Sequence, residues 1–312
     1  MRRAGGRRGP VAALPALCLL WSLGSLRSDL LPGVFARTEG VPALERMALP
    51  YALFAVGAAA VAMMRRLRWP RGRALRDAVL VGLGLFAAPG LVTVPAGSWV
   101  PELTRVALYS LTPVFAVILE PYLGAGENGV RGGLAAAMVA VAGTLLLFPV
   151  ELPGSFVAAC SFAAVVAAVA CVAASNCLGV RVARERECGV AAMAAVAAGT
   201  AAVALAGTGA IVERSAWTAH GLGPVFVWAA LVDVPALGLL FWLMRRMSAA
   251  RMTTRFVVAP LLTNLIGLAI LQPSVSMRDG SGLVLIACGA GWLLAGKDKP
   301  DAESEILRIG EG

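Results

Sequence analysis

Ten apolar stretches, each long enough to cross a lipid bilayer, constrain this chain more than any other feature. A helix that spans the hydrocarbon core needs about 20 mostly apolar residues, and ten such stretches follow one another with short connections rich in Gly, Pro and Arg. We expect no strands, because an open sheet edge cannot satisfy its backbone groups in lipid. The predicted spans are residues 11–26, 44–64, 75–96, 103–123, 131–150, 155–178, 189–212, 221–244, 255–272 and 280–296.

The composition agrees with a chain surrounded by lipid. Hydrophobic residues make up 59% of the 312 residues and charged residues only 14%, and the mean hydropathy is +0.81. A soluble domain carries roughly 25% charged residues, so a soluble enzyme, a disordered chain and a disulfide scaffold are all excluded or disfavoured. Ala, Gly, Val and Leu dominate, which is typical of membrane helices that pack closely on small side chains. The predicted fold class is an all-α integral membrane protein.

The positive charges predict how the spans are oriented. The net charge of +9 would suggest nucleic acid for a soluble protein, but here the arginines gather between apolar stretches, and we expect no nucleic-acid partner. If the N-terminus is inside, most of the 27 Lys and Arg residues fall on the cytoplasmic side, including clusters at 65–76, 181–186 and 245–255. We assign Arg255 to the last of these clusters. Both termini are therefore predicted to be cytoplasmic, in the inner (plasma) membrane of a bacterium.

The first span has a second interpretation. Its arginine-rich start and its short apolar stretch also resemble a signal peptide, and nine spans would remain after cleavage. Small-residue faces occur on nearly every expected helix, so the sequence would permit a homodimer as well as a monomer.

The spans divide into two halves that share local features. Residues 1–152 and 153–296 each contain five spans, and 297–312 form a polar cytoplasmic tail. An odd number of spans per half would place the second half upside down relative to the first, as in inverted-repeat transporters. The fourth span of each half has a related core, at 112–116 (Thr-Pro-Val-Phe-Ala) and 259–264 (Ala-Pro-Leu-Leu-Thr-Asn), and a Gly-rich span follows each.

The chain resembles the EamA-type members of the drug/metabolite transporter superfamily over about residues 11–296. The resemblance is carried by the number of spans, the charge pattern and three stretches: 20–24 (Leu-Trp-Ser-Leu-Gly), 111–116, and Pro260 with Gly267 ahead of a Gly-rich last span. It implies a bundle of ten transmembrane helices, arranged as two inverted five-helix repeats, that moves small metabolites.

The chain also departs from the family pattern at three places. Family members usually have Trp-Gly where this chain has Trp21-Ser22, and a Gly-Glu pair just after spans four and nine. Gly126-Glu127 supplies the first pair one residue late, and Gln272-Pro273 stands in place of the second. The resemblance is therefore to a divergent member.

Polar residues inside spans are the candidate pathway residues, because they cost free energy in lipid and usually face a cavity or a partner. In span four, Arg105, Tyr109, Thr112 and Glu120 follow one another at helical spacing and share one face. The guanidinium of Arg105 suits a substrate carboxylate or phosphate. The alternative is that Arg105 and Glu120 lie near opposite ends of the span and extend to the two interfaces.

Asp233 is the strongest single candidate. It lies near the middle of span eight, and Pro235 follows it and should kink the helix. Its carboxyl group could bind a cation, a substrate amine or a proton; the alternative is a neutral carboxyl held by a hydroxyl or a carbonyl group.

Asn264 and Asn176 are either cavity residues or helix–helix hydrogen-bond partners, and Trp21 is either a substrate platform or a packed aromatic.

The motifs of an enzyme or a metalloprotein are missing from the sequence. There is no Walker A motif and no His-Glu-x-x-His motif, and the six cysteines and single histidine have no metal-site spacing, so we expect neither a cofactor nor a metal. We predict a secondary transporter that moves a small polar organic metabolite, amino-acid-like or similar, by alternating access through the bilayer. The alternatives are a non-transporting polytopic membrane protein and an intramembrane lipid-modifying enzyme.

Overall fold

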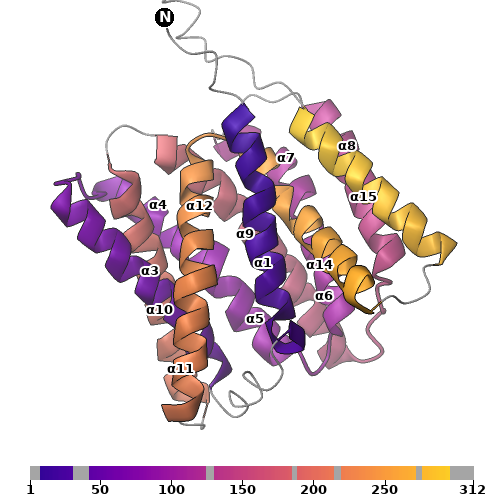
Figure 1. The fold of residues 1–312 in the computed structure, drawn as a ribbon, viewed down its shortest axis with the longest axis horizontal. Helices are drawn as coiled ribbons and strands as arrows, with labels where there is room; N and C mark the ends of the chain where they lie inside the picture. The colour runs from indigo at the N-terminus through magenta and orange to yellow at the C-terminus, as the bar shows by residue number, and fades with distance from the viewer. Residues whose placement is uncertain are drawn as a thin grey trace, which may run out of the picture.

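The described part of the chain is entirely helical. The computed structural model describes residues 8–30, 42–123, 130–184, 188–213, 219–271 and 276–295, and every regular element there is a helix (Figure 1). The first half contains α1 (Arg8–Leu30), α3 (Ala43–Met64), α4 (Gly72–Val81), η2 (Gly82–Ala87), α5 (Ala88–Ala96), α6 (Glu102–Tyr109), α7 (Thr112–Leu123) and α8 (Val130–Leu147). The second half contains α9 (Phe156–Arg184), α10 (Val190–Val212), α11 (Ala219–Trp228), η3 (Ala229–Asp233), α12 (Val234–Met244), α13 (Ala249–Thr253), α14 (Arg255–Leu271) and α15 (Met277–Ala295).

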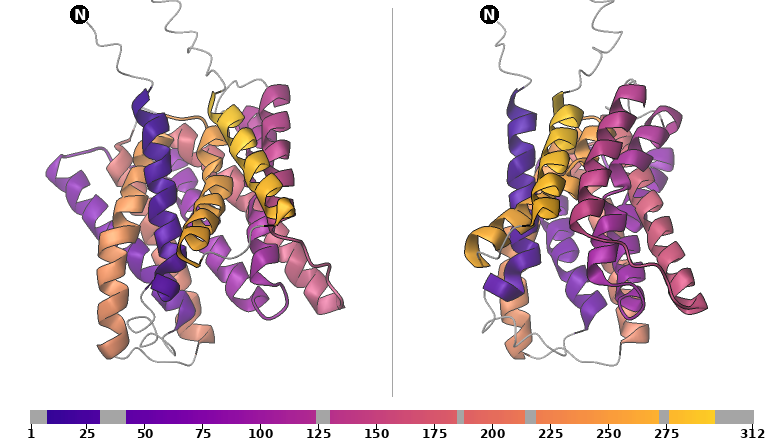
Figure 2. Two further views of the ribbon diagram at one scale, coloured as in Figure 1. Left: turned by 45° about the vertical axis from the view of Figure 1, so that its right-hand side comes forward. Right: turned by 90° about the vertical axis from the view of Figure 1, so that its right-hand side faces the viewer.

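Eight stretches of described helix are long and apolar enough to cross a membrane, which supports an all-α integral membrane protein. Figure 2 shows the helices gathered into one bundle with most axes running in a similar direction. The two other expected spans, 131–150 and 280–296, coincide with α8 and α15, and Gly132–Leu147 of α8 is a shorter apolar helix. The eight candidate spans are Gly9–Leu26, Ala43–Met64, Gly72–Ala96, Glu102–Leu123, Phe156–Arg184, Val190–Val212, Gly221–Met244 and Ala249–Ile270.

Two of these spans contain a π-helical turn just before a proline. η2 interrupts the span Gly72–Ala96, and η3 interrupts the span Gly221–Met244. Pro89 and Pro235 are each the second residue of the α-helix that follows. A proline lacks the N–H group and its ring clashes with the carbonyl four residues earlier, and the wider π turn accommodates both effects. The kink expected at Pro235 therefore takes the form of a π-helical turn that ends at Asp233.

The bundle is organised by pairs of helices from opposite halves of the chain. α3 packs along α10, α8 packs along α15, α7 packs against α9, and α1 packs against α14. The α3–α10 pair is fixed at both ends: the carboxylate of Glu213 accepts hydrogen bonds from the N–H groups of Ala43 (2.8 Å) and Leu44 (3.0 Å), and Gly189 donates to the carbonyl of Arg68 (3.0 Å). A carboxylate at the N-terminus of α3 also interacts favourably with the helix dipole.

Glycines allow α8 and α15 to approach each other closely. A Cβ atom at Gly143 of α8 would lie 2.7 Å from the carbonyl oxygen of Gly282 on α15, and a Cβ at Gly289 would meet the backbone of Ala140. Helices in lipid associate mainly through such close packing, since lipid tails are as apolar as the side chains.

The substitution Gly143→Leu should therefore separate α8 from α15. We expect overpacking to lower the free energy of unfolding by about 1–3 kcal/mol, measured as a lower melting temperature of the detergent-solubilised protein. Gly291→Leu is the matched control, because Gly291 lies on α15 with nothing within 4 Å of a Cβ atom. Equal melting temperatures for the two variants would contradict the packing described.

Candidate functional site

Two adjoining hollows lie between the halves of the bundle. One has a volume of about 480 Å³ and lies among α1, α3, α5 and the η3 region, and the other has a volume of about 310 Å³ and lies among α5, α6 and α14. Thr93 lines both, and we refer to the two hollows together as the chamber. Its polar and aromatic lining residues are Trp21, Ser25, Arg46, Tyr51, Phe86, Thr93, Glu102, Arg105, Tyr109, Asp233 and Phe256.

Charged groups of both signs line the chamber. Asp233 and Arg46 line the first hollow, and Arg105 and Glu102 line the second. Asp233 ends the π-helical turn η3 and approaches α1 at Gly24, where a Cβ atom would lie 4.0 Å from its Oδ1. A glycine at this position leaves the space beside the carboxylate free of a side chain.

Arg105 and Tyr109 add polar groups that the protein does not fully satisfy. They are one turn apart on α6, so they share a face. Nη1 of Arg105 donates to the carbonyl of Thr93 (3.0 Å), while its Nε and the hydroxyl of Tyr109 are buried without a hydrogen-bond partner. Buried polar atoms without hydrogen-bond partners are costly and rare. A ligand bound in the chamber would supply the missing partners.

Aromatic rings continue from one hollow to the other. The ring of Phe256 lies 6.3 Å from that of Trp21 and 6.3 Å from that of Tyr109, centre to centre. Tyr51 packs on Phe86 at 5.1 Å on the other wall of the first hollow. Such rings provide large apolar surface next to the charged groups.

Arg255 lies behind these rings, and its side chain is fully buried in the protein. The charge pattern assigned it to a cytoplasmic cluster and did not predict this burial. Its Nη2 donates to Oδ1 of Asn176 (2.8 Å) and its Nη1 to the carbonyl of Met252 (3.1 Å). The guanidinium lies 5.0 Å from the ring centre of Trp21 and 4.7 Å from that of Phe256, so cation–π contacts stabilise it further.

Polar contacts join the halves of the chain at the end of the bundle where α4 and α13 begin, called here the closed end. Asp77 of α4 forms an ion pair with Nη2 of Arg181 on α9 at 2.6 Å. Oε1 of Glu120, at the end of α7, accepts a hydrogen bond from the backbone N–H of Ala249 at the start of α13 (3.1 Å). Asp77 and Glu120 are both buried.

The structure brings four of the eight sequence-predicted residues to the chamber: Trp21, Arg105, Tyr109 and Asp233. The other four lie outside its lining. The buried Thr112 donates to the carbonyl of Tyr109 (2.6 Å), and Asn264 donates to the carbonyl of Pro260 (3.2 Å). Glu120 belongs to the closed end, and Asn176 accepts from Arg255.

Sequence reasoning missed several lining residues. Arg46 and Glu102 occur in the first turns of their helices, where charged residues usually reach the interface, so nothing in the pattern singled them out. In the sequence, Tyr51 and Phe256 cannot be distinguished from other aromatic residues within apolar spans. The one available signal was that Arg46 lies four residues before a proline inside its helix, Pro50, which also lines the chamber.

The comparisons with known proteins identify a shared fold. No protein-family model matches the chain, and no curated protein matches its sequence. Among 29 matching chains of solved structures, one described as "Crystal structure of protein" has a TM-score of 0.73 and 19% sequence identity, covering 93% of this chain and 99% of its own. At this identity the match shows a common fold alone.

Thiol labelling can test whether the chamber admits water. In a cysteine-free background, Thr93→Cys should react with a charged, membrane-impermeant thiol reagent, because Thr93 lines both hollows. Thr112→Cys is the matched control, since Thr112 is fully buried outside the chamber, and it should react much more slowly. The chamber assignment is wrong if both cysteines react at the same rate in the folded protein.

Proposed function

We propose that this protein is a secondary transporter of the EamA type that moves a small zwitterionic, amino-acid-like metabolite by alternating access between two inverted five-helix repeats. The observation that carries the proposal is the chamber itself. It places Asp233, Arg46 and Arg105 beside aromatic rings between helices that are predominantly apolar. Ionisable residues inside membrane helices usually mark a substrate or ion pathway.

The helix pairing supports an inverted repeat. If α8 and α15 are counted as spans five and ten, α3–α10 joins spans two and seven, and α8–α15 joins spans five and ten. The α7–α9 contact joins spans four and six, and α1–α14 joins spans one and nine. If the two halves are exchanged, the pair two–seven and the pair five–ten each map onto themselves. The pair four–six maps onto the pair one–nine. A pseudo-two-fold axis produces this pattern.

The two π-helical turns support the same repeat. They occur in the third span of each half, and each ends two residues before a proline: η2 at Ala87 before Pro89, and η3 at Asp233 before Pro235. π turns within α-helices are frequent at functional sites. Phe86, Pro89 and Asp233 all line the chamber, so both turns adjoin the proposed substrate site.

The charges favour a zwitterion as substrate. Arg105 is the natural partner for a substrate carboxylate, because its guanidinium can donate two parallel hydrogen bonds and its Nε is unsatisfied. Asp233 would accept hydrogen bonds from an ammonium group. The rings of Trp21, Tyr109 and Phe256 would cover the apolar part of the molecule.

Alternating access requires the closed end to separate. The ion pair between Asp77 and Arg181 and the hydrogen bond between Glu120 and Ala249 each link the first half of the chain to the second. Both must break for the chamber to open at that end. Substrate binding can shift this equilibrium only if it binds one state more tightly than the other.

Transport can be tested with purified protein in proteoliposomes. Counterflow of a panel of radiolabelled amino acids should be seen with the wild type, and Asp233→Asn should lower the rate at least tenfold, since a hydrogen bond to a charged group contributes about 1.5–3 kcal/mol. Asp279→Asn is the matched control, because Asp279 is an exposed carboxylate at the start of α15, hydrogen-bonded to Ser276. A folded wild type that moves no member of the panel, or equal rates for both variants, would overturn the proposal.

The orientation expected from the charges has its own test. With both termini cytoplasmic, Arg66→Cys and Arg246→Cys should be protected from an impermeant thiol reagent added to intact cells, while Ser98→Cys should react. All three positions are exposed in the structure, so burial does not protect them. Labelling of Arg66→Cys and Arg246→Cys on opposite sides would contradict the ten-span topology.

A further inference from the structure

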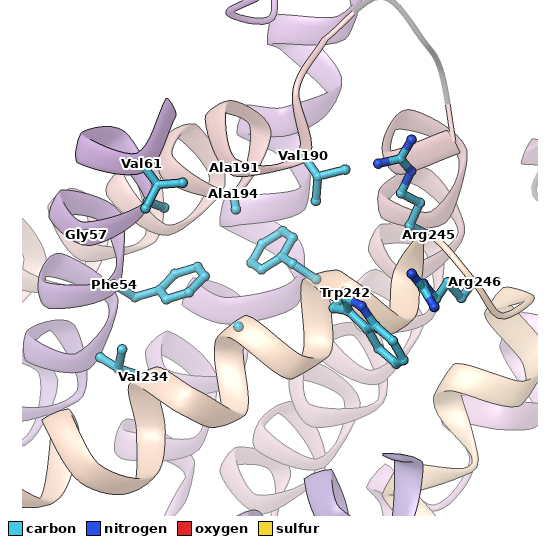
Figure 3. Close-up of a pocket in the computed structure, with 13 residues that line it drawn as sticks. Phe54, Gly57, Val61, Val190, Ala191, Ala194, Val234, Trp242, Arg245 and Arg246 are labelled. Carbon is cyan, nitrogen blue, oxygen red and sulfur yellow. The ribbon is translucent and has the colours of Figure 1, made fainter. Parts of the chain in front are cut away.

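A second, larger cavity lies away from the chamber, between α3, α10 and α12. It has a volume of about 840 Å³, and we call it the crevice (Figure 3). Figure 3 shows Phe54, Gly57 and Val61 of α3 on one side and Val234 and Trp242 of α12 on the other, with Val190, Ala191 and Ala194 of α10 behind them. Val61 and Trp242 are 42% and 37% exposed, so the crevice opens at the outer surface of the bundle.

The walls of the crevice are apolar along its length. Phe54 of α3 stacks on Phe241 of α12 at 5.7 Å, and both rings line the crevice. A Cβ atom at Gly57 would meet nothing within 4 Å, so this glycine leaves open space on the α3 wall. The α12 residues that line it run from Val234 to Trp242, a rise of roughly 12 Å at 1.5 Å per residue. Arg245 and Arg246 follow about one turn later, so the lining approaches half of the ~30 Å hydrocarbon core, the depth of one lipid leaflet.

The shallow end of the crevice is positively charged. Arg245 and Arg246 follow α12 and are both exposed there (Figure 3). The guanidinium of Arg246 lies 4.2 Å from the ring centre of Trp242, which holds it at the edge of the apolar wall. No carboxylate is among the residues that line the crevice. An apolar slot that ends in two arginines with no ion-pair partner among the described residues is complementary to a molecule with an acyl chain and an anionic head.

We propose that the crevice is a binding site for one anionic phospholipid, with an acyl chain between α3 and α12 and its headgroup phosphate on Arg245 and Arg246. The bound chain fills the space that Gly57 leaves and supports the contact between α3 and α12. The negatively charged headgroup supplies an anion for the two arginines, because basic residues near a bilayer surface attract anionic lipids. Lipid binding here is independent of what the chamber carries.

Native mass spectrometry of the detergent-solubilised full chain can test the site with two probes, phosphatidylglycerol and phosphatidylcholine. The wild type should retain one phosphatidylglycerol molecule in preference to phosphatidylcholine. Arg245→Gln with Arg246→Gln should weaken phosphatidylglycerol binding by about fivefold per arginine and roughly thirtyfold for both. Arg71→Gln with Arg73→Gln is the matched control, because it removes the same charge from exposed arginines outside the crevice.

Filling the apolar wall gives a second, independent arm. Gly57→Phe should abolish retention of the lipid, whereas Gly207→Phe should not, since Gly207 is also an exposed helical glycine with nothing within 4 Å but lies outside the crevice. A phosphatidylglycerol analogue with a photoreactive group at the end of its acyl chain should label the wild type near Phe54.

Three results would overturn the proposal. These are equal affinity of the wild type for the two lipids, undiminished phosphatidylglycerol binding by the double arginine variant, and labelling spread evenly over the lipid-facing helices. The arginine variant changes two exposed side chains only, so a folding defect in Gly57→Phe would leave the first arm decisive.

Discussion

The fold depends on how it holds one charge, that of Arg255, inside a bundle that lipid surrounds. Hydrocarbon cannot solvate a guanidinium, so its partners must come from the protein. They are the amide of Asn176, the carbonyl of Met252 and the faces of Trp21 and Phe256, while Nε is buried without a hydrogen-bond partner. These partners belong to four different helices, which the buried charge therefore holds together. Because two of them are the rings that line the chamber, the same interaction that stabilises the closed interior also positions the candidate site.

The sequence predicts the spans well because the bilayer sets a length that composition alone reveals. Apolar stretches of that length correspond to eight described candidate spans, and the two others to α8 and α15. The sequence does not predict the burial of Arg255. An arginine at the end of an apolar stretch gives the same sequence pattern whether its side chain faces water or points into the protein. The sequence does not predict the π turns either. A proline in a span indicates that the helix is distorted, but not that the distortion is a π turn.

The residues of the candidate site were likewise only partly predictable from the sequence. Asp233, Arg105 and Tyr109 are recognisable because their polar groups cannot be satisfied within their own helix. Thr112 and Asn264 carry the same signal in sequence, yet each donates to a carbonyl three or four residues earlier in the chain and lies outside the chamber lining. Sequence cannot separate these two outcomes, because the choice depends on which way each helix is rotated. The apolar spans have no periodicity that would fix this rotation.

If the two halves are repeats, the functional features are the places where they differ. A symmetric bundle would present the same groups from both sides and could not orient a dipolar substrate. Asp233 stands where the first half has Ala87, so this carboxylate has no counterpart at the related position of the other half. Between α10 and α5, the pair that corresponds to α3 and α12, the buried Leu205 packs against Gly90. On α3, Gly57 leaves such space open. Differences at such positions thus leave one carboxylate beside the chamber without a counterpart and one crevice open between α3 and α12.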